Sequence, residues 1–165
     1  MAQVIAKMRP CCEHARFTQV ENLHLTIVFL GETPSDKLSI IKEGMDSVNI
    51  SPFSLYVGGF GYFHRKGGDI FWAGVERSKS LVTLHDQTYT QMKNHGFHLE
   101  RRGFCPHLTL ARQVLLKREY DHSAFVVPAI KMPVEKITLF QSQRQGGKLH
   151  YIPLYNKFLL KEKEI

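Results

Sequence analysis

The sequence contains no hydrophobic run approaching the ~20 residues needed to span a bilayer. The segment from Met1 to Pro10 also lacks the long apolar stretch of a secretory signal. Apolar residues make up 43% of the 165 residues and charged residues 22%, which is ordinary for a globular protein. These features predict a cytoplasmic protein with a single domain over residues 1–165, large enough to bury its own core.

Cysteine is scarce, with three residues in the chain. Cys11 and Cys12 are adjacent and Cys105 stands alone, so a disulfide framework is not expected and a reducing compartment is favoured. Cys105 lies two residues before His107, but no base-orienting group is evident beside it. A small buried thiol is therefore favoured over a thiol nucleophile at this position.

No histidine or cysteine cluster has the spacing of a zinc site, and the H-E-x-x-H motif is absent. The only loose groups are His14 near Cys11-Cys12, and His95 with His98. We expect neither a metal nor another cofactor.

The chain has no block of five or more like charges, so a disordered polybasic tail is not supported. Its 22 Lys and Arg residues nevertheless outnumber 15 acidic residues, giving a net charge of +7. This balance indicates an anionic partner, with nucleic acid as the first candidate. A merely soluble basic surface is the alternative.

What the sequence does contain twice is the tripeptide His-Leu-Thr, at residues 24–26 and 107–109, each time in apolar β-type sequence. In an extended strand, side chains two apart share a face. His24 and Thr26 therefore point the same way, as do His107 and Thr109, while each leucine points back into a core. If the two segments lie side by side, two imidazoles and two hydroxyls converge.

Such a site could cleave a phosphodiester without a metal. Two imidazoles, whose ordinary pKa lies near neutrality, can serve as base and acid in one turnover. A hydroxyl beside each can donate a hydrogen bond to an anionic oxygen. A single His-Leu-Thr is usually structural, and threonine is a favoured strand residue. The duplication in matching context favours catalysis.

The first half of the chain predicts one strand over Leu23 to Leu30, closed by Gly31. A helix should follow, with Thr33 as N-cap, Pro34 at the first helical position and an apolar stripe of Leu38, Ile41 and Met45. Two further strands are expected at Phe53 to Val57 and Ile70 to Val75, separated by turns at Gly58-Gly59 and Gly67-Gly68-Asp69.

A second helix should run from Ser78 or Ser80 to His95, stopping at Gly96. Its buried face is predicted to consist of Leu81, Leu84, Thr88 and Met92. The second motif then begins a strand ending near Arg112. Val134 to Gln141 and His150 to Leu159 read as closing strands across a turn at Gly146-Gly147, with Pro153 marking an edge or a bulge.

These elements predict an α+β fold of two pseudo-symmetric lobes of antiparallel sheet with flanking helices, and an active site in the cleft between them. The segments Glu21 to Glu32 and Pro106 to Arg112 resemble the 2H phosphoesterase superfamily, whose signature is two H-x-[TS] motifs. The closest resemblance is to the RNA 2′,3′-cyclic phosphodiesterases, also called 2′-5′ RNA ligases. It extends over Ala2 to Leu160, including Trp72 to Val75 and a closing Tyr151-x-Pro153-Leu154.

Relatives begin with a short strand and a long helix, of which Val4 to Pro10 resembles only the end. The missing strand would expose a sheet edge that a second chain could cover. We expect a monomer and leave a dimer open.

The resemblance implies that His24 and His107 exchange protons during hydrolysis of a 2′,3′-cyclic phosphate on RNA ends or nucleosides, leaving a 2′-phosphate. Thr26 and Thr109 would hold the non-bridging oxygens. In reverse, with a 5′-hydroxyl end, the same chemistry would form a 2′-5′ linkage.

Arg112 matches the family's H-x-T-x-x-R and could bind phosphate through two hydrogen bonds. Strict alternation would turn it away from the histidine face, so this role requires a bulge or a strand end. Phe29 could stack on a base or belong to the core. Trp72 and Tyr151 are expected to be packing residues.

Two other functions stay open at this point. One is an RNA-binding module without turnover, with affinity supplied by the positive charge. The other is a 2H phosphodiesterase acting on another substrate, such as ADP-ribose 1″,2″-cyclic phosphate or a 2′-5′ oligonucleotide.

Overall fold

The structure is a computed structural model that describes residues 1–100 and 103–160. Helices and antiparallel strands alternate along the chain, which confirms the predicted α+β class. Backbone contacts divide the chain into two compact units. The first comprises Met1–Thr26, Tyr56–Glu76 and Pro106–Lys131, and the second comprises Ile27–Leu55, Arg77–Cys105 and Met132–Ile165. In the described ranges, no helix combines the length and hydrophobicity that a membrane crossing would need.

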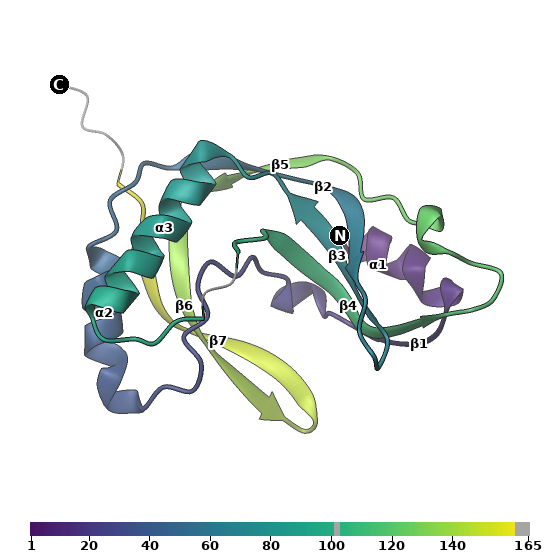
Figure 1. The fold of residues 1–165 in the computed structure, drawn as a ribbon, viewed down its shortest axis with the longest axis horizontal. Coiled ribbons are helices and arrows are strands. Elements are labelled where there is room, and N and C mark those ends of the chain that lie inside the picture. Colours follow the sequence, from purple (N-terminus) through teal and green to yellow (C-terminus); the bar gives the residue numbers. More distant parts are fainter. Residues whose placement is uncertain (101–102, 161–165) are drawn as a thin grey trace. The chain divides into compact units, whose positions relative to one another are not determined.

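A five-stranded sheet in the order β1-β4-β3-β2-β5 lies mostly in the first unit (Figure 1). Its strands are β1 (Cys12–Phe17), β2 (Phe53–Phe63), β3 (Asp69–Val75), β4 (His107–Leu116) and β5 (Ile130–Val134). The first unit also contains helix α1 (Ala2–Met8) and the short 3-10 turns η1 (Arg9–Cys11), η2 (Val20–Asn22) and η4 (His122–Ala124). Helix α1 agrees with the helical end predicted for Val4 to Pro10.

One face of this sheet carries the core of the first unit. Phe71 of β3 and Leu110 of β4 are fully buried there. The ring of Phe125, which follows η4, lies 5.3 Å from that of Phe71. Phe125 lines the same pocket as Met8 of α1, so the helix and the segment after η4 cover the same face.

The sequence reasoning missed β1. This strand pairs antiparallel with β4, so that Phe17 lies across from Ala111. Arg9 stacks on the Phe17 ring at 4.6 Å, on the face that carries the core. The short segment between the N-terminal helix and the first motif thus forms the edge of the sheet.

The segment from Leu23 to Leu30 is not a strand, so that prediction is wrong. Only Leu25 within it pairs with another strand, through an isolated antiparallel bridge to Leu108. The reason is tertiary, because the following residues enter the second unit. There Val28 and Leu30 pack against the buried core of two helices, and that burial outweighs their strand propensity.

The strands β2 and β4 are both longer than predicted. β2 passes through Gly58-Gly59 instead of turning there, because its register with β3 shifts between Val57 and Phe60 and Gly59 adopts φ +75°. This is a bulge, in which glycine provides the positive φ. β4 likewise continues beyond Arg112, with Gln113 at φ 52°.

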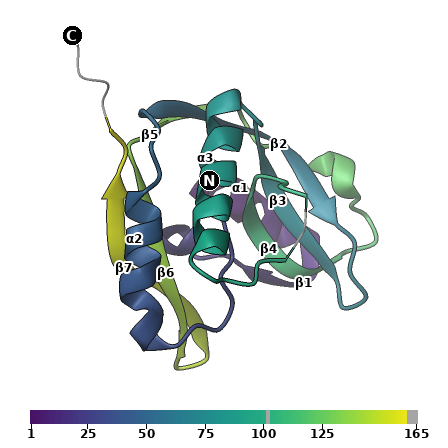
Figure 2. The same ribbon diagram turned by 60° about the vertical axis from the view of Figure 1, so that its left-hand side comes forward.

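The second unit contains η3 (Ser35–Lys37), α2 (Leu38–Asp46), α3 (Lys79–Asn94) and a two-stranded ribbon of β6 (Lys136–Gln145) and β7 (Lys148–Phe158). Figures 1 and 2 both show α2 and α3 side by side. Ile41, Met45 and Met92 form a buried cluster between them, against which Leu139 and Tyr155 of the ribbon pack.

Helix α3 follows its prediction closely. The Ser78 hydroxyl accepts a hydrogen bond from the backbone N–H of Leu81, which makes Ser78 the N-cap. The four residues predicted to be buried are buried, and Gly96 ends the helix at φ +85°. The apolar pattern of the α3 sequence therefore agrees with the burial of this helix in the fold.

The predicted start of α2 is wrong. Pro34 is extended, with ψ 146°, and the Thr33 hydroxyl donates to the carbonyl of Gly31 rather than capping a helix. A 3-10 turn therefore precedes Leu38, where the α-helix begins.

The closing hairpin is confirmed. Gly146 and Gly147 form its turn with φ values of 56° and 78°, a left-handed pair that glycine adopts without strain. The register of the ribbon shifts between Leu139 and Phe140, whose partners are Tyr155 and Pro153. Pro153 therefore lies beside a bulge, as predicted.

Candidate active site

The two His-Leu-Thr motifs lie side by side in the first unit, joined by the bridge between their central leucines. In this antiparallel register, Thr26 lies across from His107, and His24 lies across from Thr109. By strand alternation around the bridge, the four side chains are expected on the face opposite to the leucines. Each histidine therefore has the threonine of the other motif as its neighbour.

A backbone hydrogen bond orients the His24 ring. Its Nδ1 lies 2.7 Å from the carbonyl oxygen of Asn22. Because a carbonyl oxygen only accepts, Nδ1 must carry the proton, and in the neutral ring Nε2 holds the lone pair. Nε2 is therefore the nitrogen that can take up or release a proton toward a ligand.

Aromatic side chains pack around His107. Phe63 meets its ring edge-on with centroids 5.3 Å apart, and Trp72 lies 6.1 Å away. The Trp72 ring covers Gly61 so closely that a Cβ there would lie 2.1 Å from the indole. Trp72 is thus a packing residue of the histidine face, as predicted. Its buried Nε1 has no hydrogen-bond partner among residues 1–100 and 103–160.

A bulge in β4 turns Arg112 toward the histidine face. The register between β4 and β3 shifts between Thr109 and Ala111. Leu110 and Ala111 are both 0% exposed, so two consecutive side chains face the core. The exposed Arg112 therefore emerges on the same face as Thr109. This is the bulge that a phosphate-binding role for Arg112 requires, and the role itself stays a prediction.

The sequence reasoning missed Arg16. It lies on β1 directly across from Arg112 and is exposed. Its neighbour Phe17 faces the core beside Ala111, so Arg16 points to the histidine face. The available signal was the alternation of polar and apolar residues over residues 14–17.

Phe29 belongs to the second unit, and its side chain is 75% exposed. This exposure excludes the core alternative, so base stacking stays as its predicted role. Tyr151 contacts Phe140 edge-on at 6.2 Å within the ribbon, in keeping with packing.

The three cysteines are all free thiols. Cys105 is exposed, so the prediction of a buried thiol is wrong. Burial raises the pKa of the Cys12 thiol, and the adjacent Cys11 raises it further. Cys12 is therefore protonated at neutral pH, which suits a structural residue.

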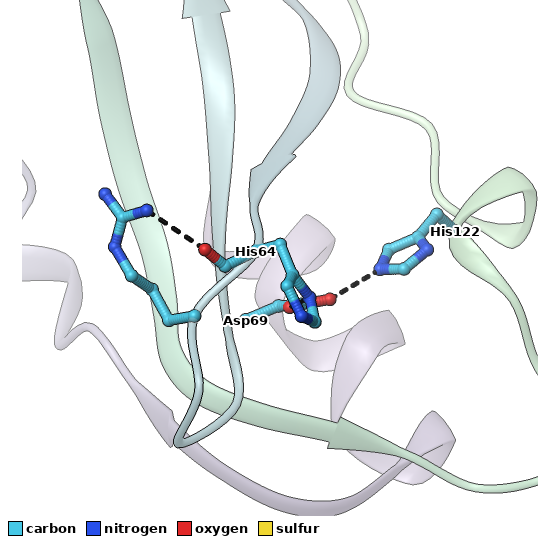
Figure 3. A network of polar contacts seen from close by, with 4 residues as sticks. His64, Asp69 and His122 are labelled. Carbon is cyan, nitrogen blue, oxygen red and sulfur yellow. Dashed lines mark hydrogen bonds and ion pairs between the residues drawn. The ribbon is translucent and has the colours of Figure 1, made fainter.

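A second group of polar side chains joins the β2–β3 turn to η4 (Figure 3). Asp69, 14% exposed, accepts hydrogen bonds of 2.9 Å from Nδ1 of His64 and from Nε2 of His122. The His122 ring also stacks on Tyr62 at 3.6 Å. Among the described residues, no group of three His, Cys, Asp or Glu side chains is arranged to hold a metal.

The sheet with its two facing motifs has the architecture implied by the sequence resemblance, and comparison with known proteins agrees. The profile of the 2′-5′ RNA ligase superfamily matches residues 1–146. A relative from Thermotoga maritima, named RNA 2′,3′-cyclic phosphodiesterase, is 33% identical over 173 aligned positions, covering 91% of this chain and 90% of the relative. The chain therefore belongs to the 2′-5′ RNA ligase superfamily, and the predicted family is confirmed.

A second relative and a solved structure are also similar to this chain. The Escherichia coli protein named RNA 2′,3′-cyclic phosphodiesterase is 26% identical, covering 86% of this chain and 78% of that protein. The crystal structure of Escherichia coli LigT complexed with 3′-AMP has a TM-score of 0.80 at 24% identity, covering 97% of this chain and 91% of that chain. This structural likeness shows the shared fold.

Proposed function

We propose that this chain is a metal-independent RNA 2′,3′-cyclic phosphodiesterase that uses His24 and His107 as general base and general acid. One observation carries the proposal. The Leu25–Leu108 bridge brings the two motifs together, and strand alternation around this bridge favours a common face for both histidines and both motif threonines. Membership of the superfamily and the printed names of its relatives support the substrate class.

In the proposed reaction, one imidazole removes a proton from water as the water oxygen forms a bond to phosphorus. The bond between phosphorus and the 3′ oxygen breaks, and the other imidazolium gives its proton to that oxygen. The product is a 2′-phosphate with a free 3′-hydroxyl. Each turnover exchanges the protonation states of the two rings, which solvent then restores.

The other side chains stabilise negative charge. Thr26 and Thr109 would donate hydrogen bonds to the non-bridging oxygens as charge grows at phosphorus. Arg112 would bind a phosphate of the RNA strand through its planar guanidinium. Phe29 would stack on a base. With a 5′-hydroxyl end in place of water as the attacking group, the same proton transfers would break the bond to the 3′ oxygen and form a 2′-5′ linkage.

The test is hydrolysis of a panel of cyclic phosphates in the presence of EDTA, with the product identified by NMR. We expect nucleoside 2′,3′-cyclic phosphates and RNA ends carrying them to be converted to 2′-phosphates. If only ADP-ribose 1″,2″-cyclic phosphate or a 2′-5′ oligonucleotide is turned over, that compound would replace RNA cyclic phosphates as the substrate assigned to the enzyme. RNA binding without any turnover would overturn the enzyme proposal.

A further inference from the structure

We propose that Arg16 and Arg112 together form a second phosphate site that binds the phosphodiester preceding the cyclic end, so that the preferred substrate is an oligonucleotide. This inference rests on the proposed function and deepens it by assigning the length of the substrate. It begins from the register of β1 and β4, in which Arg16 lies directly across from Arg112.

Two features make this arginine pair unusual for a merely structural contact. Like charges directly opposite one another in an antiparallel pair destabilise a sheet. No carboxylate within residues 1–100 and 103–160 lies within ion-pair distance of either guanidinium. Two adjacent cations without a carboxylate partner among the described residues are a suitable site for an anion.

The position of the pair identifies the anion. The β4 bulge and the pairing of Phe17 with the buried Ala111 together turn both arginines to the face that carries His107 and Thr109. Along β4, Arg112 lies three residues beyond Thr109, which is roughly 10 Å at the rise of an extended strand. Because an arginine side chain is long and flexible, its guanidinium group can lie nearer to Thr109 or farther from it than this backbone distance. A nucleic-acid strand with its cyclic end at the histidines would bring its next phosphate into this region.

The chemistry of the site favours a phosphodiester over a base. Guanidinium groups bind phosphate oxygens bidentately and carry no base preference when they contact the backbone. The site should therefore raise affinity for oligonucleotides of any sequence, and this affinity should weaken with salt.

The experiment compares a pentaribonucleotide ending in a 2′,3′-cyclic phosphate with a nucleoside 2′,3′-cyclic phosphate, using the full chain. We expect the wild type to prefer the pentanucleotide in kcat/KM. Arg16→Gln should reduce this preference about tenfold, mainly through KM. Arg118→Gln removes the same charge from an exposed turn of the first unit and should leave the preference unchanged. Equal effects of Arg16→Gln on both substrates, or no effect, would overturn the inference.

A binding measurement separates this inference from the proposed function. Fluorescence anisotropy with a labelled pentaribonucleotide carrying a 3′-phosphate requires no turnover. Arg16→Gln should weaken binding and lower the slope of log K against log salt by about 0.7. If this occurs without hydrolysis of any cyclic phosphate, the phosphate site stands and the phosphodiesterase proposal falls. If hydrolysis is seen but the slope does not change, the phosphate site falls alone.

Discussion

At the scale of single residues, the proposed chemistry depends on two imidazoles that come from segments far apart in the sequence. Each lies across from the threonine of the other motif, and a backbone carbonyl orients the His24 ring. Removing either ring removes one proton transfer, and each such transfer contributes roughly 10²- to 10⁴-fold to a rate.

We predict that His24→Ala and His107→Ala each reduce kcat by at least 10²-fold. The double variant should be little worse, because the pair acts as a unit. Steady-state hydrolysis of a nucleoside 2′,3′-cyclic phosphate measures this, with His64→Ala as control because that side chain is 86% exposed and outside the motifs. Near-normal kcat in either single variant, with unchanged thermal unfolding, would contradict the mechanism.

The pH dependence of kcat/KM should be bell-shaped. One ring must start neutral and the other protonated, and imidazoles ordinarily titrate between about pH 5 and 8. Activity is therefore lost at low pH when the base is protonated, and at high pH when the acid is deprotonated. The two limbs of this bell-shaped profile report the two histidines as a coupled pair and are not assigned to one ring each. A profile that stays flat from acid to alkaline pH would exclude these rings as base and acid.

Gly61 supports the site through its lack of a side chain. We predict that Gly61→Ala displaces the Trp72 ring that packs beside His107. The expected effects are a loss of about 1–3 kcal/mol in the free energy of unfolding and a lower kcat. Gly67→Ala is the matched control, since no heavy atom lies within 4 Å of its added Cβ. The free energy of unfolding in urea and the kcat would be measured for both variants. Equal values for Gly61→Ala and Gly67→Ala would show that the contact with Gly61 does not hold the indole in place.

At the scale of elements, local signals determined the structure where no tertiary contact opposed them. Helix α3 is the clearest case, because its cap, its apolar stripe and its terminal glycine all agree with its environment. The first motif is the opposite case, because β-type residues became a single bridge followed by core packing in the second unit.

We predict that Ser78→Ala lowers the free energy of unfolding by about 1 kcal/mol, because it removes the acceptor for the Leu81 N–H at the start of α3. Ser80→Ala, two residues inside the same helix, should be neutral or slightly stabilising, because alanine has the higher helix propensity. Thermal or urea unfolding monitored by circular dichroism would detect the difference. Equal values for the two variants would mean that the cap does not stabilise this helix.

At the scale of the whole molecule, the proposed chemistry needs no cation other than side chains. The net charge of +7 and the histidine pair provide positive charge and proton transfer. We predict that hydrolysis is unchanged by excess EDTA, measured after dialysis against the chelator. Activity that disappears and is restored by one particular divalent metal would contradict this.

The sequence by itself determined the family, the two motifs, α3 and the closing hairpin with its bulge at Pro153. These features depend on short-range chemistry such as capping, glycine turns and alternation, which a linear pattern contains. The doublet of His-x-Thr could be recognised because the side-chain period of two fixes which residues share a face.

Only the tertiary structure decided which strands are neighbours and how they are shifted. The bulge between Thr109 and Ala111 depends on pairing with β3, and the opposition of Arg16 and Arg112 depends on β1. Neither register can be predicted from local propensity. A shift of one residue turns every side chain of a strand to the opposite face of the sheet without changing the strand propensity of the segment. The two arginines of the proposed second phosphate site can therefore be found in the sequence, but only the long-range pairing of β1 with β4 brings them together.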